Sequence, residues 1–323
     1  MFTEALEVFF GVSASMQVPS KVIATTPQYS QQMCHPQPEW RIRSLARCSS
    51  LQAMPALVSG SCVHSAGYSM GDLQRCVLAG ADGIVQVPNM RWSRELLTGN
   101  EYSSARKAAK HGGFMDGADC FDSVIFSISS AEASAMDPQQ RLLLECGHRA
   151  HNFSSELCVG GRDVWEEDVG VFIGIELQDF ESILPTLPSG RSVYANTGTT
   201  LSAACGRLSY VFGFQGPCGA YATACSSSLS AMHAASNALV CTECLSALAA
   251  GANMILLPAG SLQAAIAGMI SLQGRSHTFD SRADGYARSE AISVSAMSAH
   301  TQMQLIEVEG SAVRNDGRSA SLT

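Results

Sequence analysis

The sequence predicts an α/β protein in which helices cover a buried sheet. Apolar runs that are typical of strands alternate along the chain with longer runs that have helical periodicity. Of the 323 residues, 46% are hydrophobic and only 15% are charged, which favours a large core or a large subunit contact. The length is compatible with about two domains.

This prediction rests on seven segments between residues 138 and 297, four of them strand-like and three helix-like. The strand-like runs are short and apolar, and they cover residues 169–175, 219–224, 245–250 and 292–297. The helix-like runs repeat apolar residues at helical spacing, and they cover residues 138–153, 201–212 and 226–240. The two kinds of run interleave, so we expect helices to pack on a sheet.

A cysteine lies at the junction between one predicted strand and the helix that follows it. The run Tyr221-Ala222-Thr223-Ala224-Cys225-Ser226-Ser227-Ser228-Leu229 predicts a strand, a tight turn of small residues and a helix start. Partial positive charge and unpaired N–H groups at a helix N-terminus favour the nucleophilic thiolate. Serines 226–228 are expected to supply N-capping oxygens. The sequence therefore predicts a strand–nucleophile–helix elbow at Cys225, with a buried inert cysteine as the alternative.

The residues around this elbow resemble the active-site region of β-ketoacyl synthase domains, particularly those of modular type I polyketide synthases. The resemblance continues through an ordered series of landmarks from about residue 51 to the end of the chain. They include Val87-Pro88-Asn89-Met90-Arg91-Trp92, Met136-Asp137-Pro138-Gln139-Gln140-Arg141, Gly206-Arg207-Leu208-Ser209-Tyr210, Gly216-Pro217, Thr278-Phe279-Asp280, Arg288 with Glu290, and Gly310-Ser311-Ala312-Val313.

The resemblance implies the thiolase-like layered fold (α-β-α-β-α), here mainly its N-terminal half. It divides the chain into a leader or linker at 1–50, the ketosynthase N-terminal half at 51–304 and the truncated start of the C-terminal half at 305–323. Two similar halves pack together in that family. Homodimers form partly through the strand before the nucleophile, which corresponds to about 219–224 here.

The resemblance also implies the chemistry, which is acyl transfer in polyketide biosynthesis or, as the alternative, in fatty acid biosynthesis. Cys225 would accept an acyl group from a carrier thioester, its own backbone N–H would contribute to the oxyanion hole, and a malonyl thioester would then condense with loss of carbon dioxide. The donors would be phosphopantetheine thioesters on an acyl carrier protein or on coenzyme A, with no bound cofactor and no metal. Two histidines that stabilise the enolate belong to the family's second half, and the chain ends at Thr323 before either. We therefore expect slow acylation without condensation.

Two other functions remain as alternatives at this point. The first is a non-catalytic ketosynthase-like scaffold or dimerisation partner. The second is a cysteine hydrolase, which would need a His and an acidic partner near Cys225. His233 lies eight residues further along the same predicted helix, about 12 Å away, so it is predicted to be structural. An incomplete gene model is a further explanation of the early end.

Several positions depart from the family pattern. Ala222 stands where an aspartate is usual, so the elbow is expected to lack a polar support, and Cys218 replaces a small polar residue. Ser289 and Ala291 flank Glu290 at positions that are usually glycine. If those glycines adopt positive φ, the backbone here is expected to shift or to be strained.

Composition excludes other classes. The net charge of −8 and the absence of a Lys/Arg cluster argue against a nucleic-acid partner. Twelve cysteines scattered through a long chain fit a reducing compartment. The Cys241–Cys244 pair has no second pair at zinc-like spacing, so a metal or redox role is disfavoured.

The remaining predictions concern compartment and membrane. Residues 1–50 are rich in Pro, Gln and Ser and predict a poorly ordered leader, with organelle targeting as an alternative to a cytoplasmic location. The uncharged stretch 245–273 is long enough to span a bilayer. Because polar residues, a proline and glycines interrupt it, we expect a strand, a loop and a helix at about 262–270, with the strand and the helix both buried in the core, and a transmembrane segment is the alternative.

Overall fold

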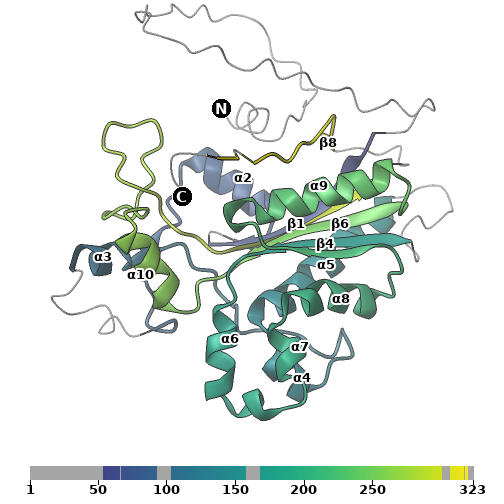
Figure 1. The fold of residues 1–323 in the computed structure, drawn as a ribbon, viewed down its shortest axis with the longest axis horizontal. Coiled ribbons are helices and arrows are strands. Elements are labelled where there is room, and N and C mark those ends of the chain that lie inside the picture. The colour runs from purple at the N-terminus through teal and green to yellow at the C-terminus, as the bar shows by residue number, and fades with distance from the viewer. Residues whose placement is uncertain are drawn as a thin grey trace, which may run out of the picture.

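A six-stranded mixed sheet forms the centre of the computed structural model (Figure 1). The structure describes residues 54–65, 67–92, 103–157, 168–299, 306–315 and 317–318, without the side chains of 153–157. The predicted leader at 1–50 lies outside these residues. The strand order is β5-β4-β6-β7-β1-β8, and β2 pairs with β3 in a separate small ladder. The strands are β1 (Ala56–His64), β2 (Val85–Gln86), β3 (His111–Gly112), β4 (Val169–Ile175), β5 (Cys218–Tyr221), β6 (Ser246–Asn253), β7 (Ala291–Ser298) and β8 (Ile306–Glu307).

Helices cover both faces of this sheet, so the described part of the chain has three layers. α9 lies on one face, and α5 and α8 lie on the other (Figure 1). The α-helices are α2 (Met70–Ala79), α3 (Ser103–Ala108), α4 (Ser130–Ala135), α5 (Pro138–Leu157), α6 (Asp179–Ile183), α7 (Ala195–Thr199), α8 (Leu201–Phe212), α9 (Ser227–Val240) and α10 (Pro258–Ile266). Short 3₁₀ turns occupy Leu184–Thr186, Pro188–Arg191 and Ala224–Ser226. The α/β prediction is confirmed, with a thiolase-like arrangement.

All the predicted elements are present, and β4 and α8 keep the predicted bounds. β6, β7 and α5 occur with slightly longer spans. The strand predicted at 219–224 ends at Tyr221, because the chain turns there toward the elbow. The helix predicted at 262–270 is α10, which begins four residues earlier at Pro258, since proline suits a first helical turn. Left-handed Gly268 follows its end.

The uncharged stretch therefore forms a buried strand, a loop and a helix, as predicted. The expectation that the helix belongs to the core is wrong, because Ser261 is its one buried residue. Among the helices that the structure describes, none combines the length and the apolar character that a bilayer span requires.

Side chains of the central strands alternate between the two layers of helices. In β4, Val171 and Ile173 belong to the larger core against α5 and α8, whereas Phe172 belongs to the core beneath α9. The face beneath α9 is otherwise made mostly of small residues. Because alanines of α9 such as Ala231 and Ala235 pack on it, the helix lies close to the sheet.

Two glycines of the sheet allow the first turn of α9 to pack closely against it. Gly174 of β4 and Gly251 of β6 are paired in register. A Cβ at Gly174 would overlap the backbone of Ser227 and Ser228, whereas a Cβ at Gly251 would meet mainly the side chain of Ser228. The start of α9 can thus lie close to β4 because Gly174 has no side chain.

Gly174→Ala is expected to lower the free energy of unfolding by about 3 kcal/mol, because the backbone of Ser227 cannot yield as a side chain can. Gly251→Ala is the comparison, with a smaller expected loss of about 2 kcal/mol, because the Ser228 hydroxyl can rotate away but the Ser228 Cβ, 2.8 Å from the added carbon, must shift. Urea denaturation of both variants measures the difference. Equal losses of unfolding free energy in the two variants would contradict the claim that the Gly174 contact is the tighter one.

Candidate active site

The predicted elbow is present, with Cys225 at its tip. β5 ends at Tyr221, the chain turns through residues 222–223, and a 3₁₀ turn over Ala224–Ser226 leads into α9. Ala224 has a φ of +53°, a left-handed conformation that residues with a Cβ rarely adopt. Cys225 is exposed, so its sulfur is reachable by a reagent from solution. The strand–turn–helix geometry matches the prediction, and the exposure of Cys225 contradicts the alternative that this cysteine is buried.

The serines of the elbow brace the turn, and the prediction that they cap the helix is wrong for Ser226. The N-cap residue of α9 is Ser226, but its side chain makes no capping bond. Its hydroxyl instead donates to the Thr223 carbonyl at 2.7 Å. Ser227 accepts from the Thr223 N–H at 2.8 Å and donates to the Ala224 carbonyl at 2.7 Å. Because these hydroxyls form hydrogen bonds with backbone groups of the turn, they do not accept from the N–H groups of the first helical turn.

A polar support for the elbow comes from a residue that sequence reasoning missed. Ala222 lacks the carboxylate that the family pattern has, but Glu176 Oε2 accepts the N–H of Ala224 at 3.0 Å. Glu176 follows β4 directly, and β4 runs parallel to β5. The carboxyl ends of parallel neighbours meet at one edge of a sheet. A charged residue just after the predicted strand at 169–175 was the signal that could have found it.

The backbone around Cys225 leaves a hydrogen-bond donor free. Among the described residues, none accepts the N–H of Cys225. That group points from the start of a helix, where the positive end of the peptide dipoles favours negative charge. An oxyanion that develops on a carbonyl bonded to the sulfur would find this donor nearby.

A cavity of about 400 Å³ begins beside the elbow, between α9 and the segment that follows β8. Its walls combine apolar and hydroxyl side chains of α9 with residues 310–314. Ser226, the residue after Cys225, contributes to its lining, together with Leu229, Met232 and His233. Cys225 itself is not among the lining residues, so the cavity lies beside the elbow and not at the sulfur. Its volume would hold part of a small acyl or pantetheine group.

No described histidine is placed to act on Cys225 as a general base. His233 is held on α9 by Ser311, whose hydroxyl lies 2.8 Å from Nδ1, and by Asn237, whose amide lies 2.9 Å from Nε2. Both ring nitrogens are therefore in use, as a structural role predicts. His277 lies in the loop after α10 with its own backbone in the left-handed region. His35 and His300 lie outside the described residues.

The other cysteines differ in their reactivity. Burial raises the pKa of Cys146 and of Cys244 to about 11, so these thiols are protonated and inert at neutral pH. Cys241, the partner of Cys244 in the Cys-x-x-Cys string, is exposed just after α9. Cys120 and Cys218 are exposed as well. Labelling of Cys225 must therefore be compared with labelling of the three other exposed thiols among the described residues, and with that of Cys34, Cys48 and Cys158, which lie outside them.

Cys218 is expected to be the strongest competitor, because a hydrogen bond from the Cys205 thiol lowers its pKa to about 6. The same contact raises the pKa of buried Cys205. Alkylation of Cys218 should rise with pH around 6 and level off above it. In Cys205→Ala the midpoint should move up toward the ordinary thiol value of about 8.5. A pH series with iodoacetamide and peptide mapping measures both midpoints, and an unchanged midpoint in the variant would refute the contact.

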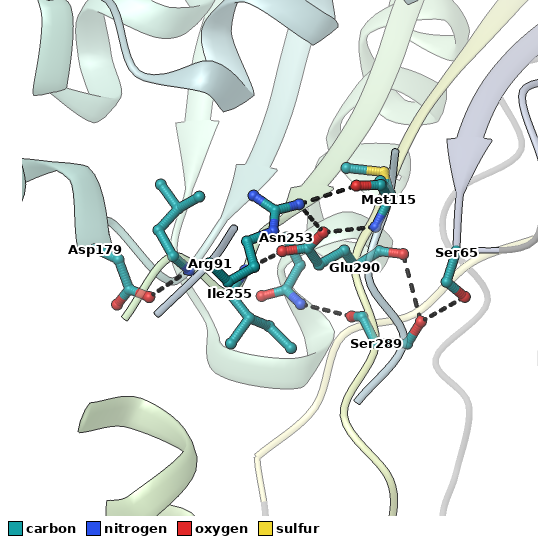
Figure 2. A network of polar contacts seen from close by, with 9 residues as sticks. Ser65, Arg91, Met115, Asp179, Asn253, Ile255, Ser289 and Glu290 are labelled. Carbon is teal, nitrogen blue, oxygen red and sulfur yellow. Dashed lines mark hydrogen bonds and ion pairs between the residues drawn. The ribbon is translucent and has the colours of Figure 1, made fainter. Parts of the chain in front are cut away.

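A buried carboxylate ties together three segments behind the site (Figure 2). Glu290 is fully buried, and its Oε2 accepts from Arg91 Nη2 at 2.7 Å and from the Met115 N–H at 2.8 Å. Its Oε1 accepts the N–H of Ile255 at 2.8 Å. Burial raises the pKa of Glu290, and the donors that surround it oppose that shift. Asp179 fixes the same loop by accepting the N–H groups of residues 256 and 257.

The strain expected beside Glu290 is absent. Neither Ser289 nor Ala291 has a positive φ, so a side chain is tolerated at both positions. Ser289 accepts a bond from Asn253 Nδ2 at its carbonyl, and its hydroxyl donates to Ser65 Oγ at 3.1 Å (Figure 2). These departures from the family pattern are therefore accommodated in the fold.

Together these features define a thiolase-like α/β protein that presents an exposed cysteine at a strand-to-helix turn. Residues 56–302 match the family model of the beta-ketoacyl synthase N-terminal domain. The chain belongs to the β-ketoacyl synthase family of enzymes, as the sequence resemblance predicts.

Relatives and solved structures agree with this assignment. The chain is 36% identical over 256 residues to a phenolphthiocerol/phthiocerol polyketide synthase of Mycobacterium tuberculosis, covering 76% of this chain and 16% of that protein. It is 36% identical over 277 residues to pikromycin polyketide synthase component PikAII of Streptomyces venezuelae, covering 83% of this chain and 7% of that protein. The chain thus spans a small part of the curated relatives it matches.

Among solved structures, a ketosynthase from module 6 of the bacillaene synthase of Bacillus subtilis 168 is similar, with a TM-score of 0.65 and 26% identity. That match covers 76% of this chain and 40% of the other. An oxazolomycin ketosynthase domain of Streptomyces albus JA3453 gives a TM-score of 0.66 at 26% identity, covering 76% and 42%. Both matches support the thiolase-like fold.

Proposed function

We propose that this chain carries out the acyl-transfer step of a polyketide-type ketosynthase, with Cys225 as the acyl acceptor. The observation that carries the proposal is the elbow, which combines an exposed sulfur, a free N–H on the same residue and a helix start behind it. These are the parts that covalent acyl transfer needs. Polyketide chemistry is preferred because both curated relatives are polyketide synthases.

The donor in this proposal is an acyl thioester on the phosphopantetheine arm of an acyl carrier protein or on coenzyme A. The Cys225 thiolate attacks the thioester carbonyl, the new carbon–sulfur bond forms, and the donor thiolate leaves and takes up a proton. The cavity that Ser226 helps to line, beside the elbow, would receive the acyl group or the arm.

Condensation is proposed to lie beyond this chain acting alone. Decarboxylation of a malonyl thioester needs hydrogen-bond donors at the enolate. Within the described ranges, the histidine nearest in sequence after Cys225 has both ring nitrogens engaged by Ser311 and Asn237. We therefore propose acylation of Cys225 without efficient release of carbon dioxide.

The organisation of the chain remains part of the proposal. Residues 51–304 would form the N-terminal half of a ketosynthase domain, and 305–323 would begin its second half after a leader at 1–50. β5 is an edge strand of the described sheet, which supports a homodimer formed through it. Size-exclusion chromatography with light scattering of the chain and of an Ala220→Pro variant tests this pairing, since proline removes an N–H from the edge.

The function is tested by incubating the whole chain with an acyl pantetheine thioester and, separately, with a malonyl thioester. The proposal expects release of one free thiol and one acyl adduct per chain with the first donor, and little carbon dioxide with the second. Vigorous carbon dioxide release would refute the limit to acylation. A chain that takes no acyl group at Cys225 would instead act as the non-catalytic scaffold.

A further inference from the structure

One carboxylate touches the elbow. Glu176 follows the last residue of β4, and β4 lies beside β5 in parallel register, with Gly174 opposite Tyr221. Both strands therefore end at the same edge of the sheet. From there Glu176 Oε2 accepts the N–H of Ala224, the residue before Cys225, at 3.0 Å.

This contact holds the backbone in an unfavourable shape. Ala224 is left-handed, with a φ of +53°, and its Cβ makes that conformation costly. A hydrogen bond from an N–H to an ionised carboxylate is roughly twice as strong as a neutral one. The hydrogen bond to Glu176 thus stabilises the left-handed Ala224 and offsets part of that cost. Within the turn itself, Ser227 adds a second stabilising bond by accepting the Thr223 N–H.

The same contact places a negative charge close to the nucleophile. Adjacent Cα atoms are about 3.8 Å apart, so the carboxylate bound at Ala224 lies within about 10 Å of the Cys225 sulfur, which is one Debye length at 0.1 M salt. Glu176 takes part in none of the ion pairs among the described residues. Its charge is therefore not cancelled by a neighbouring arginine or lysine there.

We propose that Glu176 is a positioning residue of the elbow and that its charge selects against anionic acyl groups at Cys225. The carboxylate holds the Ala224 amide, and it repels a donor whose acyl group ends in a second carboxylate, as in a malonyl thioester. Neutral acyl thioesters are then the preferred class for the transfer to sulfur. This proposal rests on the proposed function of Cys225 as acyl acceptor.

The test uses two alkylating reagents that differ in charge. Iodoacetamide is neutral and iodoacetate is an anion of similar size, and the modification of Cys225 by each is followed by mass spectrometry of its peptide in the whole chain. Glu176→Gln keeps an oxygen that can accept from Ala224 but removes the charge. The ratio of the iodoacetate rate to the iodoacetamide rate at Cys225 should rise roughly two- to tenfold in this variant.

Glu181→Gln removes the same charge from exposed α6 and is the matched control, with no change expected. The ratio at Cys225 should also rise with added salt, since screening at 1 M shortens the Debye length to about 3 Å. Because salt also screens the repulsion between the thiolate and iodoacetate, this rise should be smaller in Glu176→Gln than in the unmodified chain.

The result that overturns the proposal is a ratio at Cys225, and a salt dependence of that ratio, that are both the same in Glu176→Gln as in the unmodified chain. A malonyl thioester that acylates Cys225 as fast as a neutral donor would overturn it as well. The alkylation ratio does not require acyl transfer. A chain that shows the expected ratio but accepts no acyl group would therefore disprove the proposed function while leaving the charge effect established.

Discussion

Replacing Cys225 with alanine is expected to abolish acyl-enzyme formation, with a loss of at least about 100-fold relative to the unchanged chain. The reason is that the covalent intermediate has no other acceptor at the elbow, and the loss of a nucleophile removes the covalent pathway altogether. Fold stability should change little, because Cys225 is exposed and its side chain contributes little to either core. The label retained after incubation with an acyl pantetheine thioester measures the loss.

Cys241→Ala is the matched control for this substitution. Cys241 is also exposed, and it follows the other end of the same helix. Its removal should leave the label at Cys225 unchanged. If Cys225→Ala and Cys241→Ala reduced labelling equally, the label would report general thiol exposure and the assigned role of Cys225 would be wrong.

Replacing Glu290 with alanine should have the largest effect on stability, about 3–5 kcal/mol. The change leaves the Arg91 guanidinium, which is only 14% exposed, without its partner. It also leaves the N–H groups of Met115 and Ile255 buried without an acceptor (Figure 2). The loss should be measured as a lower free energy of unfolding in urea.

Glu243→Ala serves as the comparison, because Glu243 is an exposed carboxylate in a turn, and a change within about 0.5 kcal/mol is expected there. The double variant Arg91→Met with Glu290→Met separates the two contributions, since removing both charges spares the penalty of an unpaired ion. A loss below about 1 kcal/mol for Glu290→Ala would show that the three segments are held by other contacts.

Local periodicity was enough to predict the elements that build the frame of the site. β4 and α8 lie where the apolar pattern put them, because each has a buried apolar face and ends at a clear signal, such as left-handed Gly213 after α8. The cysteine at the strand-to-helix turn followed from the same pattern. The family resemblance identified the residues around it, and the family model confirms that resemblance.

What the sequence could not provide depends on contacts between distant residues. The support of Ala224 by Glu176 joins positions 48 residues apart, and no local pattern encodes it. The serines were predicted to cap α9. The Ser226 hydroxyl instead donates a hydrogen bond to the Thr223 carbonyl in the strained turn before the helix. Both differences arise because a left-handed alanine needs hydrogen-bond partners that a regular helix start does not.

The most direct test of the account is the site of acylation in the intact chain. After brief exposure to an isotopically labelled neutral acyl pantetheine thioester near pH 7, mass spectrometry of the proteolytic peptides should find the adduct on Cys225 in clear excess over any adduct on another cysteine. An adduct on Cys225 no more abundant than those on the exposed thiols of Cys120, Cys218 and Cys241 would contradict the claim that the elbow presents a nucleophile.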